Sequence, residues 1–242
     1  MNRNSLLLPF VVLGVSLVIS AFLLSQIFRF RDQANQTINV TGSAKKEITS
    51  DLGILRSNIQ AEAPTADAAY LLLQEQRPMV LQYLKEQGFD DSSVDLNTIN
   101  LNPIYEVTEQ GYSTNRVNRY IANQMIQVTS QDVQKIKSVS LDMTSLVSKG
   151  ININVMSPEY YYTKLADLKV EIQADAAKDA LQRAEKIAEA TGSDLGAITN
   201  ARMGVIQITP VNSNMISDYG INDASSIEKE ITAVVSASFR LD

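Results

Sequence analysis

The segment LGILRSNIQAEA, residues 52–63, decides how this chain folds, because its side chains alternate in character. The inward set is Leu55, Ser57, Ile59 and Ala61, and the outward set is Arg56, Asn58, Gln60 and Glu62. A period of two with one polar side is typical of a half-buried β-strand. A helix should begin just after the strand, because Thr65 is a good N-cap residue. The segment therefore predicts a sheet with helices packed against it.

Similar patterns on either side of this segment predict further strands. Their ranges are 37–47, 94–107, 117–129, 151–155, 197–210 and 230–241. Residues 108–116, which include Gly111, are predicted to form a hairpin loop. Ser50 and Asp51 are predicted to form a turn. The polar stretch 211–228 has no periodicity and is long for a connection, so we interpret it as either a binding loop or a disordered segment.

Three amphipathic segments predict helices, each with one apolar stripe. The stripes are Ala69, Leu72, Leu73, Val80, Leu81 and Leu84 in the first; Val133, Ile136, Val139, Met143 and Val147 in the second; and Val170, Ala174, Ala177, Leu181, Ala184 and Ala188 in the third. The first helix should end at Gly88 and should kink or split at Pro78. The second should be capped by Ser130 and end at Gly150, and the third should span 165–191. The predicted fold class is α+β, a mainly antiparallel sheet with helices packed on one face.

The N-terminal segment predicts a single transmembrane helix ahead of this fold. An uncharged run of 23 residues extends from Leu6 to Phe28, and Arg29 and Arg31 follow it. At 1.5 Å per residue, such a helix can cross a hydrocarbon core of about 30 Å. The length of the run and the lack of an Ala-x-Ala site favour an uncleaved anchor over the alternative, a cleaved signal peptide. The predicted organisation is an anchor at 1–31, a tether at 32–36 and one extracytoplasmic domain at 37–242.

The composition argues against most catalytic and nucleic-acid-binding functions. The chain has 27 acidic and 21 basic residues, and its basic residues are scattered, so we expect no binding to nucleic acid. It has no His and no Cys, which excludes Ser-His-Asp and Cys-His catalysis and zinc sites built from these ligands. We therefore predict that the protein is not an enzyme and uses no cofactor or metal. Carboxylate-based hydrolysis is a weaker alternative.

Four groups of residues, in this order, resemble the SIMPL-domain family (DUF541), which includes the bacterial periplasmic immunogenic proteins. They are Val40-Thr41-Gly42-Ser43-Ala44 with the stretch AEAPTADAA at 61–69; Gly88-Phe89 with Asp95-Leu96-Asn97-Thr98 and Pro103-Ile104-Tyr105; Tyr120-x-Ala122 with Val128 and Gly150-Ile151-Asn152; and AAKDA at 176–180 with Ala184, Ala188, Gly192 and Leu195-Gly196. The resemblance covers residues 37–241. Ala44 stands where the family often has a second Gly.

The resemblance implies an envelope protein without established catalytic residues. Members of the family are secreted or membrane-anchored, some form ring-shaped homo-oligomers, and some are associated with resistance to oxidative stress. We therefore expect a single-pass inner-membrane protein with its C-terminal domain in the periplasm or outside the cell. It would be a homo-oligomer with a role in envelope maintenance or stress tolerance. The alternative is a monomeric binding module that uses the 211–228 loop to hold a protein or a small molecule.

Two segments are candidates for an interface. Residues 37–44, with Val40 at their centre, have few charges and no Pro to block an open sheet edge. Tyr160, Tyr161 and Tyr162 form an aromatic run of the kind that is enriched in protein interfaces, although a place in the core is the alternative. Asp90, Asp91 and Asp95 are a weaker candidate for a divalent cation, because a solvated turn explains them as well.

Overall fold

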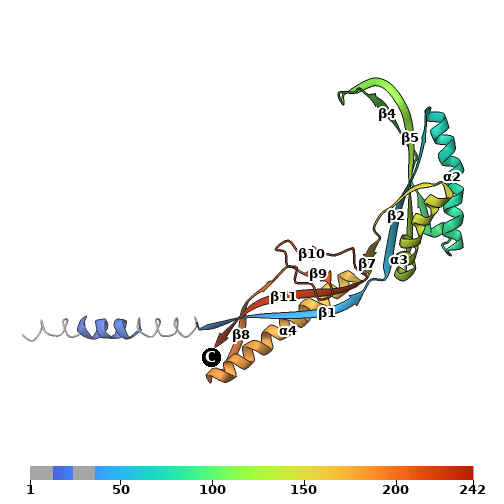
Figure 1. Cartoon of the computed structure of the whole chain (residues 1–242). Helices are drawn as coiled ribbons and strands as arrows, with labels where there is room; N and C mark the ends of the chain where they lie inside the picture. Colours follow the sequence, from blue (N-terminus) through green and yellow to red (C-terminus); the bar gives the residue numbers. More distant parts are fainter. Residues whose placement is uncertain (1–12, 24–35, 242) are drawn as a thin grey trace, which may run out of the picture. The chain divides into compact units, whose positions relative to one another are not determined.

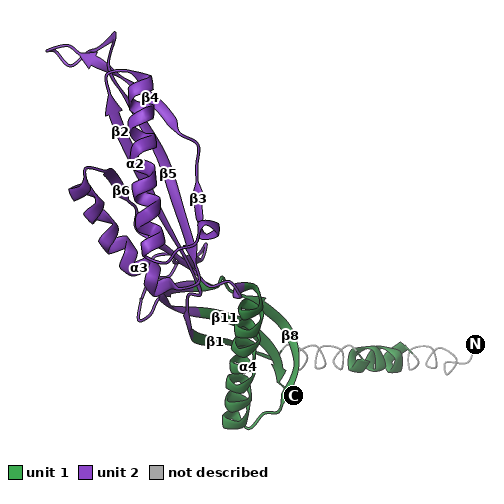
Figure 2. Cartoon of the chain, turned by 90° about the vertical axis from the view of Figure 1, so that its right-hand side faces the viewer, with its two compact units in different colours: residues 1–46, 166–207, 232–242 green, residues 47–165, 208–231 purple. Residues whose placement is uncertain are grey.

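The computed structural model describes residues 13–23 and 36–241, and these form two compact units (Figure 2). Unit 1 takes its residues from the ranges 1–46, 166–207 and 232–242, and unit 2 from 47–165 and 208–231. The chain therefore passes from one unit to the other four times, after residues 46, 165, 207 and 231.

Along the chain, groups of two to four strands are separated by single α-helices (Figure 1). The strands are β1 (Thr37–Thr49), β2 (Leu52–Ala63), β3 (Val94–Leu96), β4 (Asn100–Val107), β5 (Ser113–Ser130), β6 (Asn152–Val155), β7 (Glu159–Tyr161), β8 (Leu195–Met203), β9 (Gln207–Pro210), β10 (Ile221–Asn222) and β11 (Glu228–Leu241). The helices are α2 (Ala66–Glu86), α3 (Val133–Asp142) and α4 (Leu165–Thr191), with short 3₁₀ helices at Asp91–Ser93 and Met143–Lys149. Residues 13–23 are also helical.

The α+β class is confirmed, but the strands form two sheets where the sequence predicted one. The first has the order β1-β11-β9-β10, with β8 also paired to β11. The second has the order β3-β5-β2-β6, with β4 paired to β5 and β7 paired to β2. The turn predicted at Ser50 and Asp51 is absent, because β1 and β2 belong to different sheets.

The alternation in β2 is confirmed and organises unit 2. Side chains from Gly53 to Ala61 alternate between buried and half-buried. The buried set packs with α2 and α3, which both lie on one side of β2 and β5 (Figure 1). A single core results, and it includes Leu55, Ile59, Leu73, Ile126 and Ile136. The other face of the sheet carries the polar set.

Helix α2 begins and ends where the sequence predicts. The Thr65 side chain accepts a hydrogen bond from the Ala68 N–H, and Gly88 takes a left-handed conformation with φ +78°. The prediction of a split at Pro78 is wrong, because α2 continues through it. Burial of Leu73 and Val80 on either side holds both flanking turns on the sheet, and this packing outweighs the local penalty of about 3 kcal/mol.

The second helix begins and packs differently from the prediction. Its N-cap is Asp132, whose carboxylate accepts from the Lys135 N–H, while Ser130 is the last residue of β5. The helix also changes to a 3₁₀ helix at Met143. A 3₁₀ helix repeats every three residues, so Leu146 is buried in place of the predicted Val147, which is 57% exposed.

Two predicted strands are interrupted. Residues 97–99 separate β3 from β4, because three residues there lie opposite only two residues of β5. The Gln124 side chain donates a hydrogen bond to the Asn97 carbonyl at this irregularity. Residues 204–206 separate β8 from β9, where the Gly204 N–H bonds to the Val234 carbonyl.

The stripe predicted for α4 is partly wrong. Every fourth residue is buried, namely Leu168, Ile172, Ala176, Ala180, Ala184 and Ala188. Ala184 and Ala188 are therefore confirmed, whereas Val170, Ala174, Ala177 and Leu181 are exposed. The prediction followed the larger apolar residues Val170 and Leu181, but the face that contacts the sheet is the one with the small side chains.

Gly42 explains why small side chains are needed on α4. A Cβ at Gly42 would lie 2.2 Å from the Ala180 nitrogen and 2.3 Å from the Ala176 oxygen, so the backbones of β1 and α4 are in direct contact. One residue further, the Ser43 N–H donates to Asp179 Oδ2 at 2.8 Å. That hydrogen bond, together with Arg183, holds the pKa of Asp179 below its ordinary value. Val40, Ala184, Ala237 and Phe239 complete the local core.

We expect Gly42→Ala to destabilise the protein, because the added methyl group meets backbone atoms that cannot move aside. Overpacking of this kind costs about 1–3 kcal/mol or more. Urea unfolding followed by circular dichroism measures the change. Ser43→Ala is the matched control, since it keeps the main-chain bond to Asp179 and removes only an exposed hydroxyl group. Equal midpoints for the Gly42→Ala variant and the natural protein would show that β1 and α4 are not in close contact.

Candidate functional site

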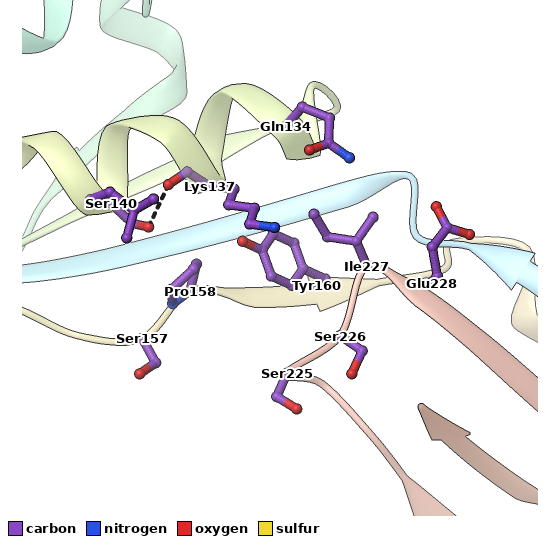
Figure 3. A pocket seen from close by; sticks show the side chains of 11 residues that line it. Gln134, Lys137, Ser140, Ser157, Pro158, Tyr160, Ser225, Ser226, Ile227 and Glu228 are labelled. Carbon is purple, nitrogen blue, oxygen red and sulfur yellow. Dashed lines mark hydrogen bonds between the residues drawn. The ribbon is translucent and has the colours of Figure 1, made fainter. Parts of the chain in front are cut away.

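Unit 2 contains a groove beside Tyr160, with a volume of about 620 Å³. In Figure 3 the Tyr160 ring lies between α3 and the segment 225–227. The groove is lined by Gln134, Lys137, Ser140 and Leu141 of α3; Ser157, Pro158 and Tyr160 around β7; and Ser225, Ser226, Ile227 and Glu228 before and at the start of β11. Its size is in the range of sites that bind small molecules or short peptide segments.

The position of Tyr160 follows from strand pairing. β7 pairs antiparallel with β2, which places Tyr160 opposite Gly53 on the inner face of the sheet. A Cβ at Gly53 would lie 3.1 Å from Ile136, so the glycine allows α3 to approach the sheet closely. The Tyr160 ring is buried as a result, and burial raises the pKa of its hydroxyl group.

A buried lysine fixes the other wall of the groove. Lys229 is only 2% exposed, and its ammonium group donates hydrogen bonds to the carbonyl oxygens of Tyr160, at 2.7 Å, and of Asp223. Burial lowers the pKa of Lys229, and the negative charge of Asp223 opposes this effect. The Tyr160 N–H also donates to the Ala224 carbonyl at 2.7 Å. These bonds join the end of the 211–228 segment to β7.

Asp223 holds the turn that leads into the groove wall. Its carboxylate accepts hydrogen bonds from the backbone and hydroxyl of Ser225, at 2.9 and 2.6 Å, and from the Ser226 N–H at 3.2 Å. Burial alone would raise the pKa of Asp223, but the hydrogen bonds from Ser225 and Ser226 and the charge of Lys229 lower it overall. The turn therefore depends on an ionised carboxylate.

The chemistry of the groove suits non-covalent binding. Its apolar surface comes from Tyr160, Ile227, Pro158 and Leu141, and Lys137 and Glu228 add one charge of each sign. Across the described residues, no three His, Cys, Asp or Glu side chains come together as a metal ion would require. Asp90, Asp91 and Asp95 accordingly form no such group.

Comparison with known proteins gives a family. Residues 38–239 match the sequence model of SIMPL, described as a protein of unknown function (DUF541).

The chain belongs to the SIMPL family.

Two relatives show how far this SIMPL chain has diverged from similar sequences. It is 24% identical over 173 residues to the uncharacterized protein YggE of Edwardsiella ictaluri (strain 93-146), an alignment that covers 70% of this chain and 69% of the relative. It is 23% identical over 164 residues to the 26 kDa periplasmic immunogenic protein of Brucella melitensis biotype 1, covering 66% of this chain and 64% of the relative.

The structure places the predicted interface residues of the SIMPL domain in different environments. Val40 is buried in the core of unit 1, and Tyr160 is buried under the groove. Tyr161 and Tyr162 line a small cavity of about 30 Å³ beside Lys229. The Tyr161 hydroxyl donates to Glu159 at 2.7 Å, which, with Arg56, lowers the pKa of that carboxylate.

The residues assigned to the membrane anchor, Leu6, Phe28, Arg29 and Arg31, lie outside the described residues. Of the predicted span, the structure describes residues 13–23. Within the described ranges, no helix has both the length and the apolar character needed to cross a membrane.

Sequence reasoning did not identify Lys229 or Asp223. The alternation of β11 could have identified Lys229, because it stands two positions before Ile231 and four before Ala233 and so faces the same way as these buried residues. A charged residue at an inward position of a strand indicates a buried, hydrogen-bonded group. Asp223 lies in a segment without periodicity, so no pattern distinguished it from its neighbours.

We expect the stability that Asp223 provides to depend on pH. Its folded-state pKa lies below the ordinary value near 3.8, so the stabilisation is present above that pH and is lost as the pH falls further. Asp223→Asn should therefore lower the urea midpoint at pH 7, and the difference from the natural protein should shrink at pH 3. The exposed Asp218→Asn is the control and should match the natural protein at both pH values. A difference of the same size at pH 3 and pH 7 would contradict the role of the carboxylate charge.

Proposed function

We propose that this SIMPL protein is a non-catalytic, membrane-anchored component of the bacterial envelope that assembles with copies of itself. Residues 6–28 form the anchor and residues 37–242 lie outside the cytoplasm. The uncharged N-terminal run and the periplasmic naming of the Brucella relative support this location. The absence of His and Cys from the sequence supports a function without catalysis. The physiological role is envelope maintenance or tolerance of oxidative stress, as the family resemblance implies.

The observation that carries the proposal of self-assembly is the hairpin formed by β4 and the first half of β5. We call residues 100–117 the arm. In Figure 1 the arm curves away from α2, and nearly all of its side chains are exposed. Its exposed apolar residues are Leu101, Tyr105, Val107, Tyr112 and Val117. Val107 is 64% and Tyr112 is 74% exposed.

An arm of this kind favours a partner with the same surface. An isolated two-stranded hairpin is only marginally stable in water, and a group of exposed apolar side chains typically marks an interaction site. A second arm would cover these residues and satisfy open hydrogen-bonding groups along the edge. Anchoring in one membrane would also raise the effective concentration of neighbouring arms. The edge of β1 is a weaker candidate, because Asp179 already binds the Ser43 N–H there.

We expect the double variant Val107→Ser, Tyr112→Ser to lose self-association. Light scattering of the detergent-solubilised full chain should give a multiple of the protomer mass for the natural protein and a smaller particle for the variant. The control is Val170→Ser, which removes an equally exposed valine from α4 in unit 1 and should leave the mass unchanged. A protomer mass for the natural protein at tens of micromolar would overturn the proposal of assembly.

The anchor makes a separate prediction. The full chain should stay with the membrane fraction after alkaline carbonate washing and should require detergent for release, because about 20 apolar residues suffice for a span. Sequencing the N-terminus of the mature protein from cells is the decisive measurement. A mature terminus near residue 30 would identify the segment as a cleaved signal peptide.

The groove supports a second candidate function, that of a monomeric binding module. It is lined by Tyr160 and by Ser225–Glu228, the end of the 211–228 segment that this alternative names as the binding loop. Its volume and its mostly apolar lining are typical of ligand sites. A clean protomer mass in the scattering measurement would favour this function over assembly.

A further inference from the structure

The outer face of the second sheet carries rows of amide side chains that cross neighbouring strands. In strand register, Gln60 of β2 lies opposite Asn123 of β5 on one side and Asn152 of β6 on the other. Asn123 in turn lies opposite Asn100 of β4. One row of four amides therefore runs across four strands. Asn58 and Asn154 lie opposite each other and start a second row. We call Asn58, Gln60, Asn100, Asn123, Asn152 and Asn154 the amide face.

These amides are turned away from the core. The alternating residues of the same strands, including Ile59, Ala122 and Ile153, are buried under α2 and α3. The amide residues themselves are half-buried or exposed. Among the described residues, no hydrogen bond of the structure uses the side chain of any of the six. The amide side chains therefore do not hydrogen-bond to one another along the row. Their donors and acceptors are available to a molecule outside unit 2.

Arg56 and Arg119, the basic residues at the two ends of the amide face, are already paired. At one end, Arg56 forms an ion pair with Glu159 at 2.8 Å and donates to Gln127 at 2.9 Å. At the other end, Arg119 forms an ion pair with Glu62 at 2.9 Å. Asp95 of β3, which lies opposite Gln127, adds one negative charge at this border. The face therefore offers no unpaired positive charge among the residues named, which does not suit a polyanion such as nucleic acid or an anionic membrane surface. It is also too polar to resemble the centre of a protein interface.

We propose that the amide face binds an uncharged polysaccharide strand. Each amide offers both a donor and an acceptor, which is what a sugar hydroxyl group or acetamido group requires in return. The strands repeat at about 4.8 Å, so a row of amides presents evenly spaced hydrogen-bonding groups to a polymer that is itself periodic. This site is separate from the groove and shares only Asn100 with the arm, and it adds a glycan partner to the proposed function.

Titration calorimetry of the full chain with a hexasaccharide of β-1,4-linked N-acetylglucosamine tests the proposal. A detergent without a sugar head group avoids competition. The natural protein should bind, and Gln60→Thr with Asn123→Thr should raise Kd about 25-fold, since each hydrogen-bonding group contributes about fivefold. Threonine preserves strand propensity. Asn152→Thr alone should raise Kd about fivefold, and thermal unfolding verifies that each variant is folded.

Asn200→Thr is the matched control, because it removes an exposed strand amide in unit 1 and should not change Kd. Absence of hexasaccharide binding by the natural protein, or equal binding by the double variant, would overturn the proposal. Binding that disappears in 0.5 M salt would indicate an ionic site and would also overturn it. If the double variant changed the particle mass in light scattering and left Kd unchanged, the face would be a contact between copies of the chain.

Discussion

The contact between the backbones of β1 and α4 is the constraint on which unit 1 depends. Only glycine at position 42 and alanine at 176 and 180 leave room for strand and helix to approach so closely. The same contact brings together two of the segments that carry the resemblance to the SIMPL family, VTGSA at 40–44 and AAKDA at 176–180. Because Asp179 also binds the Ser43 N–H, these segments are related by packing and hydrogen bonding, and no catalytic role is needed to explain them.

Local patterns predicted the elements well, because they depend on short-range physics. The alternation of β2, the Thr65 cap, the Gly88 end of α2 and the bounds of α4 all follow from neighbouring residues. The errors arise where distant parts of the chain decide the outcome. The buried side of α4 was set by Gly42, more than 130 positions away, and not by the size of its own apolar residues. Leu146 replaced Val147 because the helix tightened at Met143. The division into two sheets depends on which strands pair with each other, and the sequence of one strand does not show its partner.

The groove and the amide face differ in how far the sequence could predict them. The alternation of β11 shows that Lys229 faces inward. The carbonyl groups that it binds could not be predicted in this way, because they belong to β7 and to Asp223. The prediction that the alternate, polar side chains of β2 face away from the core was also correct. What it could not show is that Gln60, Asn123 and Asn152 fall into one row, because register between strands is set by the whole sheet. A binding site formed by a row of side chains across several strands therefore cannot be predicted from the sequence of any one strand.

The four passages of the chain between the two units have a consequence for how this protein can be cut or recombined. Neither unit is a continuous gene segment, so deletion of one would interrupt the other in at least one place. A protease that cleaves at one passage leaves the two units joined through the other three passages, but without a disulfide the two polypeptide fragments are no longer linked covalently. For the same reason, a gene fusion that transfers one continuous segment could not transplant one unit alone.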